Sequence, residues 1–188
     1  MSKYVERLEL ILSKNADAFR LGVDFLTRKI VDISNQNGSV YIIGNGGSAS
    51  TANHFETDLS FVRAESQSIS MKISSLASNE SLLTAVANDL DYEEVFARPI
   101  LRKGRKGDLL IVISASGNSV NLIRAVECAR SIGIDTYGIL GFDGGQLLGQ
   151  CDQSLLLCSQ IGDYGPVEDA QLAFCHAVSE EIKQTFGK

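Results

Sequence analysis

The sequence has few prolines and no low-complexity segment. Only two of its 188 residues are proline, and apolar residues make up 44% of the chain. A chain of this length and composition is expected to fold as one ordered domain with a hydrophobic core. We therefore predict a single domain over residues 1–188, in which residues 1–37 form a helical segment that packs on the core or on a neighbouring subunit.

The sequence also lacks an excess of basic residues and a long apolar run. Its formal net charge is −6 and its pI is near 4.9, whereas a nucleic-acid surface needs a basic stripe. No apolar run approaches the ~18 residues of a membrane span, and charges interrupt the first ten residues, unlike a signal peptide. We expect a cytoplasmic protein without nucleic-acid or membrane partners, although a local site for an anionic metabolite stays compatible with this charge.

Paired cysteine motifs are absent as well. None of the four cysteines forms a C-x-x-C pair. In a cytoplasmic protein such thiols stay reduced, and their usual place is that of a small hydrophobic core residue. We predict this role for Cys128, Cys151, Cys158 and Cys175.

Helical and strand patterns alternate along the chain. Residues 3–36 carry apolar side chains at spacings near three and four, which predicts one or two helices before the "NQNG" turn. Short apolar runs then predict buried strands at 39–44, 68–74, 108–114, 135–141 and 153–159, with helical patterns between and after them. This order predicts an α/β fold with a doubly wound parallel sheet and helices on both faces. Ligands of such folds bind at the carboxyl ends of the strands.

The first of these strands ends in the glycine-rich stretch "GNGGSAS" at 44–50. Glycines let the backbone approach an anion closely, and the amides of the following helix point at it. The dinucleotide fingerprint G-x-G-x-x-G is not met, because Ala49 stands where its last glycine would be, and the Walker lysine is absent. We therefore expect no nucleotide cofactor.

The strand at 108–114 ends in a second polar loop, "SASGNS". It places the hydroxyls of Ser114, Ser116 and Ser119 at a strand-to-helix turn without any arginine or lysine. This composition suits a phosphate monoester held by hydroxyls and backbone amides. Serine, glycine and asparagine are also ordinary turn and capping residues. Two such loops at one edge of a sheet favour the phosphate site.

The chain has only two histidines. His54 and Asp58 are four residues apart on one helix and share a face, while His176 lies in the last helix, eight residues after Glu168. A hydrogen bond on a helix surface would explain the first pair. The alternative, which we favour, is a catalytic or metal-binding role, because both histidines lie in segments that lead to the expected site.

Several stretches together resemble the sugar isomerase domain superfamily, and within it the sedoheptulose 7-phosphate isomerases, or phosphoheptose isomerases. The resemblance implies a flavodoxin-like sandwich, a homotetramer with sites at subunit interfaces, and a serine loop that grips a sugar phosphate. It covers nearly the whole chain. It rests on "GNGGSAS", "HF" and "DL" of the first loop and helix, "LLTAVANDLDYEEVF", "GDLLIVISASGNSVNLIRAVE", "GILGFDGGQL" and the histidine of the closing helix.

The same resemblance implies a metal-ligand set at His54, Asp58, Glu168 and His176, which suits zinc. The family has Glu where this chain has Asp58, Gln where it has Glu168, and Thr where it has Ala115. Helix geometry separates Glu168 from His176 by ~12 Å along the axis and ~80° around it. One ion can therefore take both only if Glu168 lies in an irregular first turn.

The resemblance predicts a phosphosugar ketose–aldose isomerase, an intramolecular oxidoreductase that supplies heptose precursors of cell-surface polysaccharide. Its expected reaction converts sedoheptulose 7-phosphate to D-glycero-D-manno-heptose 7-phosphate. Proton transfer between C1 and C2 needs a base, for which Asp58 or Glu168 is the candidate, and an acid, for which His176 is the candidate. The expected substrate contacts are Asn45, Gly46, Gly47, Ser48, Asn88, Asp89, Ser114, Ala115, Ser116 and Ser119.

Two other functions stay open from the sequence. The chain could isomerise a different sugar phosphate, such as another ketose or aldose phosphate or an amino-sugar phosphate. It could also be a non-catalytic protein of the same fold that binds a phosphosugar or associates with the bacterial replication initiator. The presence of both His54 and His176 favours an enzyme over such a binder.

Overall fold

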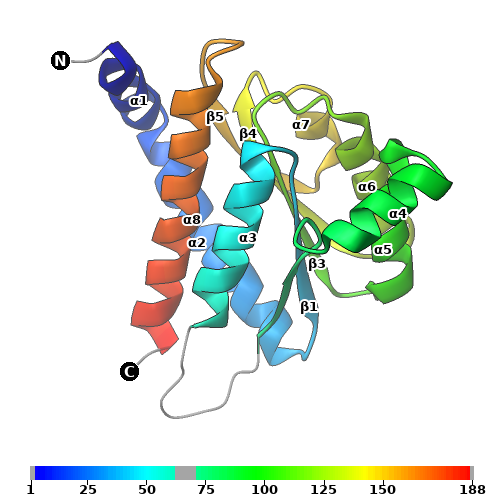
Figure 1. Ribbon diagram of the computed structural model, residues 1–188. Coiled ribbons are helices and arrows are strands. Elements are labelled where there is room, and N and C mark those ends of the chain that lie inside the picture. The colour runs from blue at the N-terminus through cyan, green and yellow to red at the C-terminus, as the bar shows by residue number, and fades with distance from the viewer. Residues whose placement is uncertain (1–2, 62–70, 187–188) are drawn as a thin grey trace.

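The computed structural model describes residues 3–61 and 71–186 (Figure 1). Five strands alternate with helices along the chain, as the sequence predicts. The elements are α1 (Lys3–Lys14), α2 (Ala16–Asn35), β1 (Ser39–Ile43), α3 (Gly47–Ser60), β2 (Lys72–Ser75), α4 (Glu80–Asp89), the 3₁₀ turn η1 (Tyr92–Glu94), α5 (Ala97–Lys103), β3 (Leu109–Ser114), α6 (Val120–Ser131), β4 (Asp135–Phe142), α7 (Leu147–Gln150), β5 (Gln153–Cys158) and α8 (Tyr164–Phe186).

The sheet is entirely parallel, with the strand order β2-β1-β3-β4-β5. In register, Val40 of β1 pairs with Leu109 of β3, and Leu109 pairs in turn with Asp135 of β4. This is the flavodoxin-like order, in which the strand sequence reverses direction between β1 and β3. The predicted fold class is confirmed, and the reversal point lies between the two polar loops.

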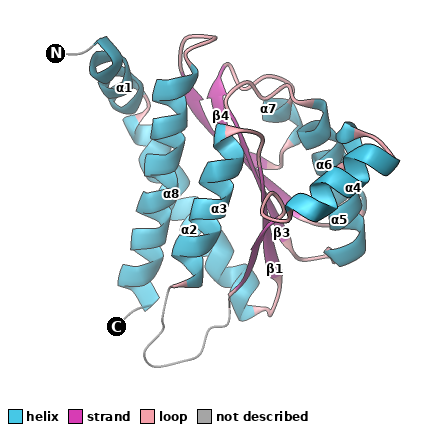
Figure 2. Ribbon diagram, in the orientation of Figure 1, coloured by secondary structure: helices cyan, strands magenta, loops and turns pink. Residues whose placement is uncertain are grey.

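Helices cover both faces of the sheet (Figure 2). One layer contains α1, α2, α3 and α8, and the other contains α4, α5, α6 and α7. Alternate side chains of β3 supply the two cores: Ile111 faces the first layer, while Leu110 and Val112 face the second. Burial on both faces explains why this strand reads as an uninterrupted apolar run.

The N-terminal helices pack on the end of their own chain. Phe19 of α2 makes an edge-to-face contact with Phe174 of α8, with ring centroids 5.3 Å apart. The hydroxyl of Tyr4 in α1 donates a 2.6 Å hydrogen bond to Asp169 of α8. This bond, together with burial and nearby carboxylates, raises the pKa of Tyr4 to about 12. Helices α1 and α2 are thus fixed against the helix that carries His176.

Most predicted boundaries of strands and helices hold within a few residues. One strand differs from its predicted bounds, and the burial of three cysteines differs from the expected core role. The predicted strand 68–74 is Lys72–Ser75, and residues 68–70 lie outside the described residues. Only Cys175 is fully buried, whereas Cys128, Cys151 and Cys158 are half-buried, so the expected core role applies fully to one cysteine of the four.

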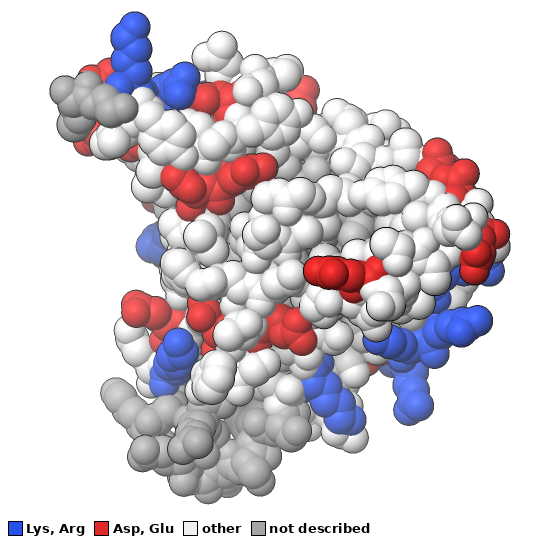
Figure 3. Space-filling view, viewed as in Figure 1, with Lys and Arg blue, Asp and Glu red and all other residues white. Residues whose placement is uncertain are grey.

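Charge is distributed unevenly over the face shown in Figure 3. Basic side chains gather on the side where α5 lies, and the last turn of α5 contains Arg102 and Lys103. Acidic side chains are spread over much of the remaining visible face. Within residues 3–61 and 71–186, none of the helices has the length and hydropathy to cross a membrane.

Candidate active site

A small cleft is lined by residues at the carboxyl ends of β1 and β3. These strand ends lie at the top of the view in Figure 1. The volume of the cleft is about 160 Å³. The first turns of α3 and α6 border it, so two helix N-termini and their free amides face the same space. The lining residues are Asn45, Ser48, Ile113, Ser114, Ala115, Ser116, Ser119, Leu122, Tyr164 and Glu168.

The glycine loop forms one wall of this cleft. Gly46 has a φ of 54°, a conformation that favours glycine, and it stands directly before α3. At Gly44, an added Cβ would lie 2.6 Å from the carbonyl oxygen of Ser48, so the turn closes tightly only without a side chain. Ser48 is buried in the first turn of α3. The loop is therefore a tight, glycine-dependent turn, and its predicted approach to an anion stays a prediction.

The serine loop forms the opposite wall. The hydroxyl oxygen of Ser114 accepts a 3.0 Å hydrogen bond from the amide of Gly117, and that of Ser116 accepts a 3.3 Å bond from the amide of Asn118. Ser119 is the N-cap residue of α6 but makes no side-chain capping bond. Because Ser114 and Ser116 accept from the backbone, their O–H groups are left to donate. Donors of this kind suit a phosphate oxygen.

The shape of the serine loop depends on Gly117. Its φ is 65°, and an added Cβ would lie 1.9 Å from the carbonyl oxygen of Gly144 in the turn after β4. The same turn is tied to the loop by bonds from the Leu147 amide to the Gly117 carbonyl and from the Gln146 amide to the Asn118 side chain. The "DGG" turn at 143–145 thus packs against the serine loop and restrains its shape.

Glu168 projects from the first turns of α8 into the same cleft. A Cβ at Gly47 would lie 2.6 Å from its Oε2 atom, so glycine at 47 leaves room for the carboxylate. Burial, with a smaller contribution from Asp169, raises the pKa of Glu168 above its ordinary value. The carboxylate is the acidic group among the residues that line the cleft, where it can accept a hydrogen bond from a sugar hydroxyl.

A second cluster lies further along α3 and α8, which pack side by side (Figure 1). The Nε2 atoms of His54 and His176 are 2.9 Å apart, and Oδ2 of Asp58 is 3.5 Å from the first and 3.8 Å from the second. We call these three residues the His–Asp–His group. Both imidazoles are about half exposed. At this separation only one of the two facing nitrogens can carry a proton, so the other presents a lone pair.

The His–Asp–His group has ligand atoms that fit a divalent metal. One ligand atom from each residue lies within 4.8 Å of the other two. Two ligands bound tetrahedrally to zinc at 2.0–2.1 Å lie about 3.3 Å apart, close to the three separations in the group. Small side-chain adjustments of a few tenths of an ångström would bring all three atoms to one ion.

The structure does not bring every predicted site residue to these two places. Glu168 lies outside the His–Asp–His group, because α8 is regular between it and His176 and keeps them ~12 Å apart along the axis. Asn88 and Asp89 end α4, where the Asn88 side chain donates to Asp89. Asp89 lines a separate groove between α4 and α5 rather than the serine-loop cleft.

Three polar residues in or beside the cleft, besides the apolar Ile113 and Leu122, were not predicted from the sequence. Asn121 is buried behind Asn45, Tyr92 reaches Asn45 from η1, and Tyr164 lines the cleft at the start of α8. Asn121 lies two residues after the serine loop, so its proximity to the site was the available signal. The contacts of Tyr92 and Tyr164 depend on long-range packing, which no local pattern indicates.

Comparison with known proteins identifies the family of the chain. A family model described as SIS domain matches residues 3–141. A phosphoheptose isomerase from Helicobacter pylori (strain Shi470) is 38% identical over 175 residues, which are 93% of this chain and 90% of the relative. A phosphoheptose isomerase from Mycobacterium tuberculosis (strain ATCC 25177 / H37Ra) is 39% identical over 148 residues, covering 77% of this chain and 72% of the relative.

Solved structures agree with the sequence comparison. Phosphoheptose isomerase GmhA from Neisseria gonorrhoeae superposes with a TM-score of 0.77 at 26% identity, covering 97% of this chain and 92% of that protein. A phosphoheptose isomerase from Francisella tularensis gives a TM-score of 0.85 at 23% identity, covering 98% and 100%, and supports the fold. The resemblance predicted from the sequence is confirmed. The chain belongs to the SIS domain family, and within it to the phosphoheptose isomerases.

Proposed function

We propose that the protein isomerises sedoheptulose 7-phosphate to D-glycero-D-manno-heptose 7-phosphate. The observation that carries this proposal is the pairing of Asp58 with His176, which places a carboxylate oxygen and an imidazole nitrogen 3.8 Å apart on two different helices. An acid and a base this close can act on two adjacent carbon atoms of an open-chain sugar. Relatives that are named phosphoheptose isomerase align with most of the chain.

The phosphate would bind in the serine-loop cleft. The hydroxyls of Ser114, Ser116 and Ser119 and the amides near Gly46–Ser48 supply hydrogen-bond donors without a basic side chain. Ala115 contributes its backbone here. The phosphate then acts as a remote handle whose binding energy holds the sugar in a fixed orientation.

Asp58 is the preferred base and His176 the preferred acid. Asp58 would remove a proton from C1 of the open-chain ketose to give a cis-enediolate, the C1 hydroxyl proton would pass to the C2 oxygen, and His176 would deliver a proton to C2. Solvent would then carry the proton from Asp58 back to His176, since both side chains are partly exposed. Glu168 is a weaker candidate for the base, since it lies ~12 Å from His176 along α8. Its position beside Gly47 supports a role as acceptor for a sugar hydroxyl instead.

A zinc ion would be held by the His–Asp–His group. When bound, it would polarise the sugar oxygens and orient the open chain. Asp58 thus has two proposed roles, that of the base and that of a metal ligand. Its carboxylate lies beside both imidazoles, a position that is compatible with each role. The ligand chemistry of the three residues supports zinc over magnesium, because imidazoles outnumber carboxylates.

We further propose a cytoplasmic homotetramer with sites completed at subunit interfaces. Large apolar side chains on the N-terminal helices are exposed in the single chain, with Leu10 at 64% and Leu21 at 58%. Asn88 and Asp89, which the chain does not bring to its own cleft, could then serve a site that a neighbouring subunit shares.

The test is a panel of C5 to C7 ketose phosphates assayed with and without a chelator. We expect turnover of the C7 sugar, and a loss of at least ~10²-fold in kcat for His176→Ala and for Asp58→Asn. Asp24→Asn on α2 is the matched control and should keep the parent rate. Full activity in folded His176→Ala and Asp58→Asn variants would refute the assigned roles, and turnover of a different sugar would change the substrate. No turnover of any sugar would favour a non-catalytic binder.

A further inference from the structure

Asn45 stands at the centre of a small network of amide and phenol groups at the edge of the serine-loop cleft. Its Nδ2 atom donates to Oδ1 of Asn121 at 2.9 Å, and Nδ2 of Asn121 donates back to Oδ1 of Asn45 at 2.9 Å. Such a reciprocal pair restrains the orientation of both amides. Asn121 is 3% exposed, so its side chain has little freedom to move away.

Tyr92 adds a third contact to the same amide. Its hydroxyl donates to Oδ1 of Asn45 at 3.1 Å, although the residue as a whole is 58% exposed. A carbonyl oxygen accepts two hydrogen bonds through its lone pairs. Asn121 and Tyr92 therefore occupy both acceptor positions of Asn45. Among the described residues, Asn121 is the partner of one N–H of Asn45, and the other N–H has none.

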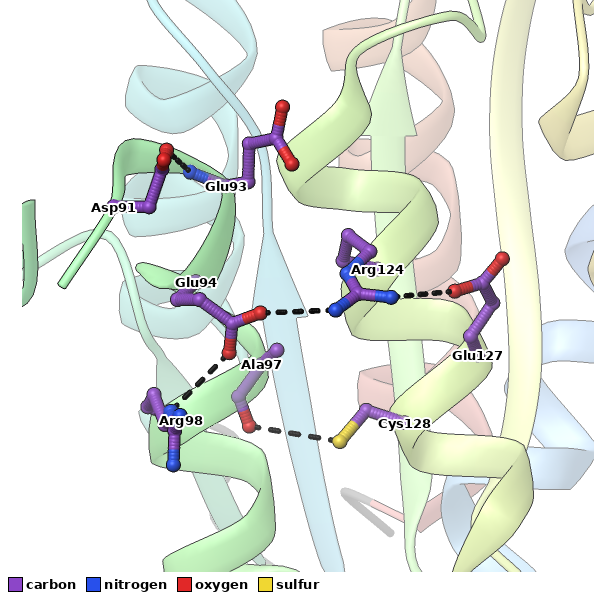
Figure 4. Close-up of polar contacts among 8 residues, drawn as sticks. All are labelled: Asp91, Glu93, Glu94, Ala97, Arg98, Arg124, Glu127 and Cys128. Carbon is purple, nitrogen blue, oxygen red and sulfur yellow. Dashed lines mark hydrogen bonds and ion pairs between the residues drawn. The ribbon is translucent and has the colours of Figure 1, made fainter.

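The backbone that carries Tyr92 is anchored to the helix that carries Asn121 (Figure 4). Glu94, at the end of η1, makes ion pairs of 3.2 Å with Arg98 of α5 and 3.3 Å with Arg124 of α6. Asp91 accepts a bond from the amide of Glu93 and so caps η1 on its other side. Tyr92 lies between Asp91 and Glu94, and the ion pair of Glu94 with Arg124 connects this turn to α6.

We propose that Tyr92 and Asn121 are positioning residues that orient Asn45, so that its amide offers the sugar phosphate one N–H donor and no acceptor. The inference rests on the proposed function and deepens it. The ligand atom opposite Asn45 must then be an oxygen that accepts, such as a phosphate, carbonyl or hydroxyl oxygen. Together with the O–H donors of the serine loop, this leaves the carboxylate of Glu168 as the charged acceptor among the lining residues, suited to ligand hydroxyls.

A simpler explanation treats the Tyr92 bond as a surface contact that only stabilises η1. The two explanations differ in what a phenylalanine does. If the bond merely stabilises the turn, Tyr92→Phe lowers the melting temperature and leaves ligand affinity unchanged. If it positions Asn45, the same variant weakens binding, and the effect disappears once Asn45 has lost its amide.

The experiment is a double-mutant cycle read by calorimetric titration with sedoheptulose 7-phosphate. Loss of one such hydrogen bond corresponds to about a five- to tenfold weaker Kd, which we expect for Tyr92→Phe, with a higher KM and little change in kcat. In an Asn45→Ala background the same Tyr92→Phe change should alter Kd by less than about twofold. Asn121→Leu, which keeps the branched shape of the side chain but removes the amide, should weaken binding like Asn45→Ala.

The matched control is Tyr41→Phe, which removes a 3.0 Å hydrogen bond to the Lys103 carbonyl away from the cleft and should leave Kd unchanged. Parent-like binding by Tyr92→Phe, or equal effects of Tyr92→Phe with and without the Asn45 side chain, would overturn the proposal. Since binding is measured directly, absence of turnover with binding intact would count against the isomerase function alone. A parent protein that binds no sugar phosphate would overturn both.

Discussion

At the scale of single residues, Glu168 both lines the candidate site and affects the folding stability of the protein. Its carboxylate lies in the cleft beside Gly47, and burial raises the pKa of Glu168. A raised carboxyl pKa means that the folded state binds this proton more tightly than the unfolded state does. Folding stability therefore falls as pH rises through the interval between the two pKa values, and the ionised carboxylate destabilises the fold at neutral pH.

The variant Glu168→Gln should consequently be more stable than the parent at pH 7. Its advantage should shrink as pH falls and vanish below about pH 4, where the glutamate is protonated in both states. Urea unfolding curves of both proteins across this range measure the difference. Glu9→Gln, at an exposed position of α1, is the control and should show no such trend. A Glu168→Gln advantage that is independent of pH would contradict the role of the charge.

The same scale shows what the sequence could predict of the site. The four-residue spacing predicts that His54 and Asp58 share a face, and the loop composition predicts that the serines gather at a strand end. The position of Asn121 near the site follows from its closeness to the serine loop, but its pairing with Asn45, 76 positions away, could not be predicted. The contact of Tyr92 with Asn45 joins residues 47 positions apart and could not be predicted either. Glu168 lies outside the His–Asp–His group, since α8 is regular from its first turns, and its ligand role stays a prediction.

At the scale of elements, the shape of the serine loop depends on the register that places the ends of β3 and β4 side by side. The turn after β4 packs against the loop after β3, and the carbonyl of Gly144 occupies the place that a Cβ of Gly117 would need. The strands and most helix ends were predictable from apolar runs, caps and glycines. This contact between two turns was not, because it follows from the register of β3 against β4.

Gly117→Ala should therefore destabilise the fold by about 2 kcal/mol or more and weaken phosphate binding. The left-handed backbone alone costs ~1–2 kcal/mol for alanine, and the contact with Gly144 adds to that cost. Gly107→Ala is the matched control, because its φ is 90° but nothing lies within 4 Å of the added Cβ. Chemical denaturation of both variants separates the two contributions. Equal losses at the two positions would show that the Gly144 contact contributes nothing.

At the scale of the whole molecule, the exposed apolar side chains of the N-terminal helices bear on assembly. We expect the parent protein to sediment as a tetramer, because Leu10 and Leu21 would otherwise remain largely exposed to water. The pair of substitutions Leu10→Glu and Leu21→Glu should shift the mass towards smaller species in analytical ultracentrifugation. Leu148→Glu on α7, on the opposite layer, should leave the mass unchanged. A parent protein that is a monomer would refute the proposed assembly.

The His–Asp–His group also joins distant parts of the chain, since its two histidines are 122 positions apart. A metal bound there would link α3 to α8 in the folded state only, and so would stabilise the whole domain. At a free zinc concentration a hundredfold above Kd, this linkage amounts to about 2.7 kcal/mol. We expect zinc to raise the melting temperature of the chelator-treated protein, and His54→Ala to abolish most of that rise. Because the measurement is thermal, it tests the metal site independently of turnover: an equal rise in the parent and in His54→Ala would place the zinc elsewhere.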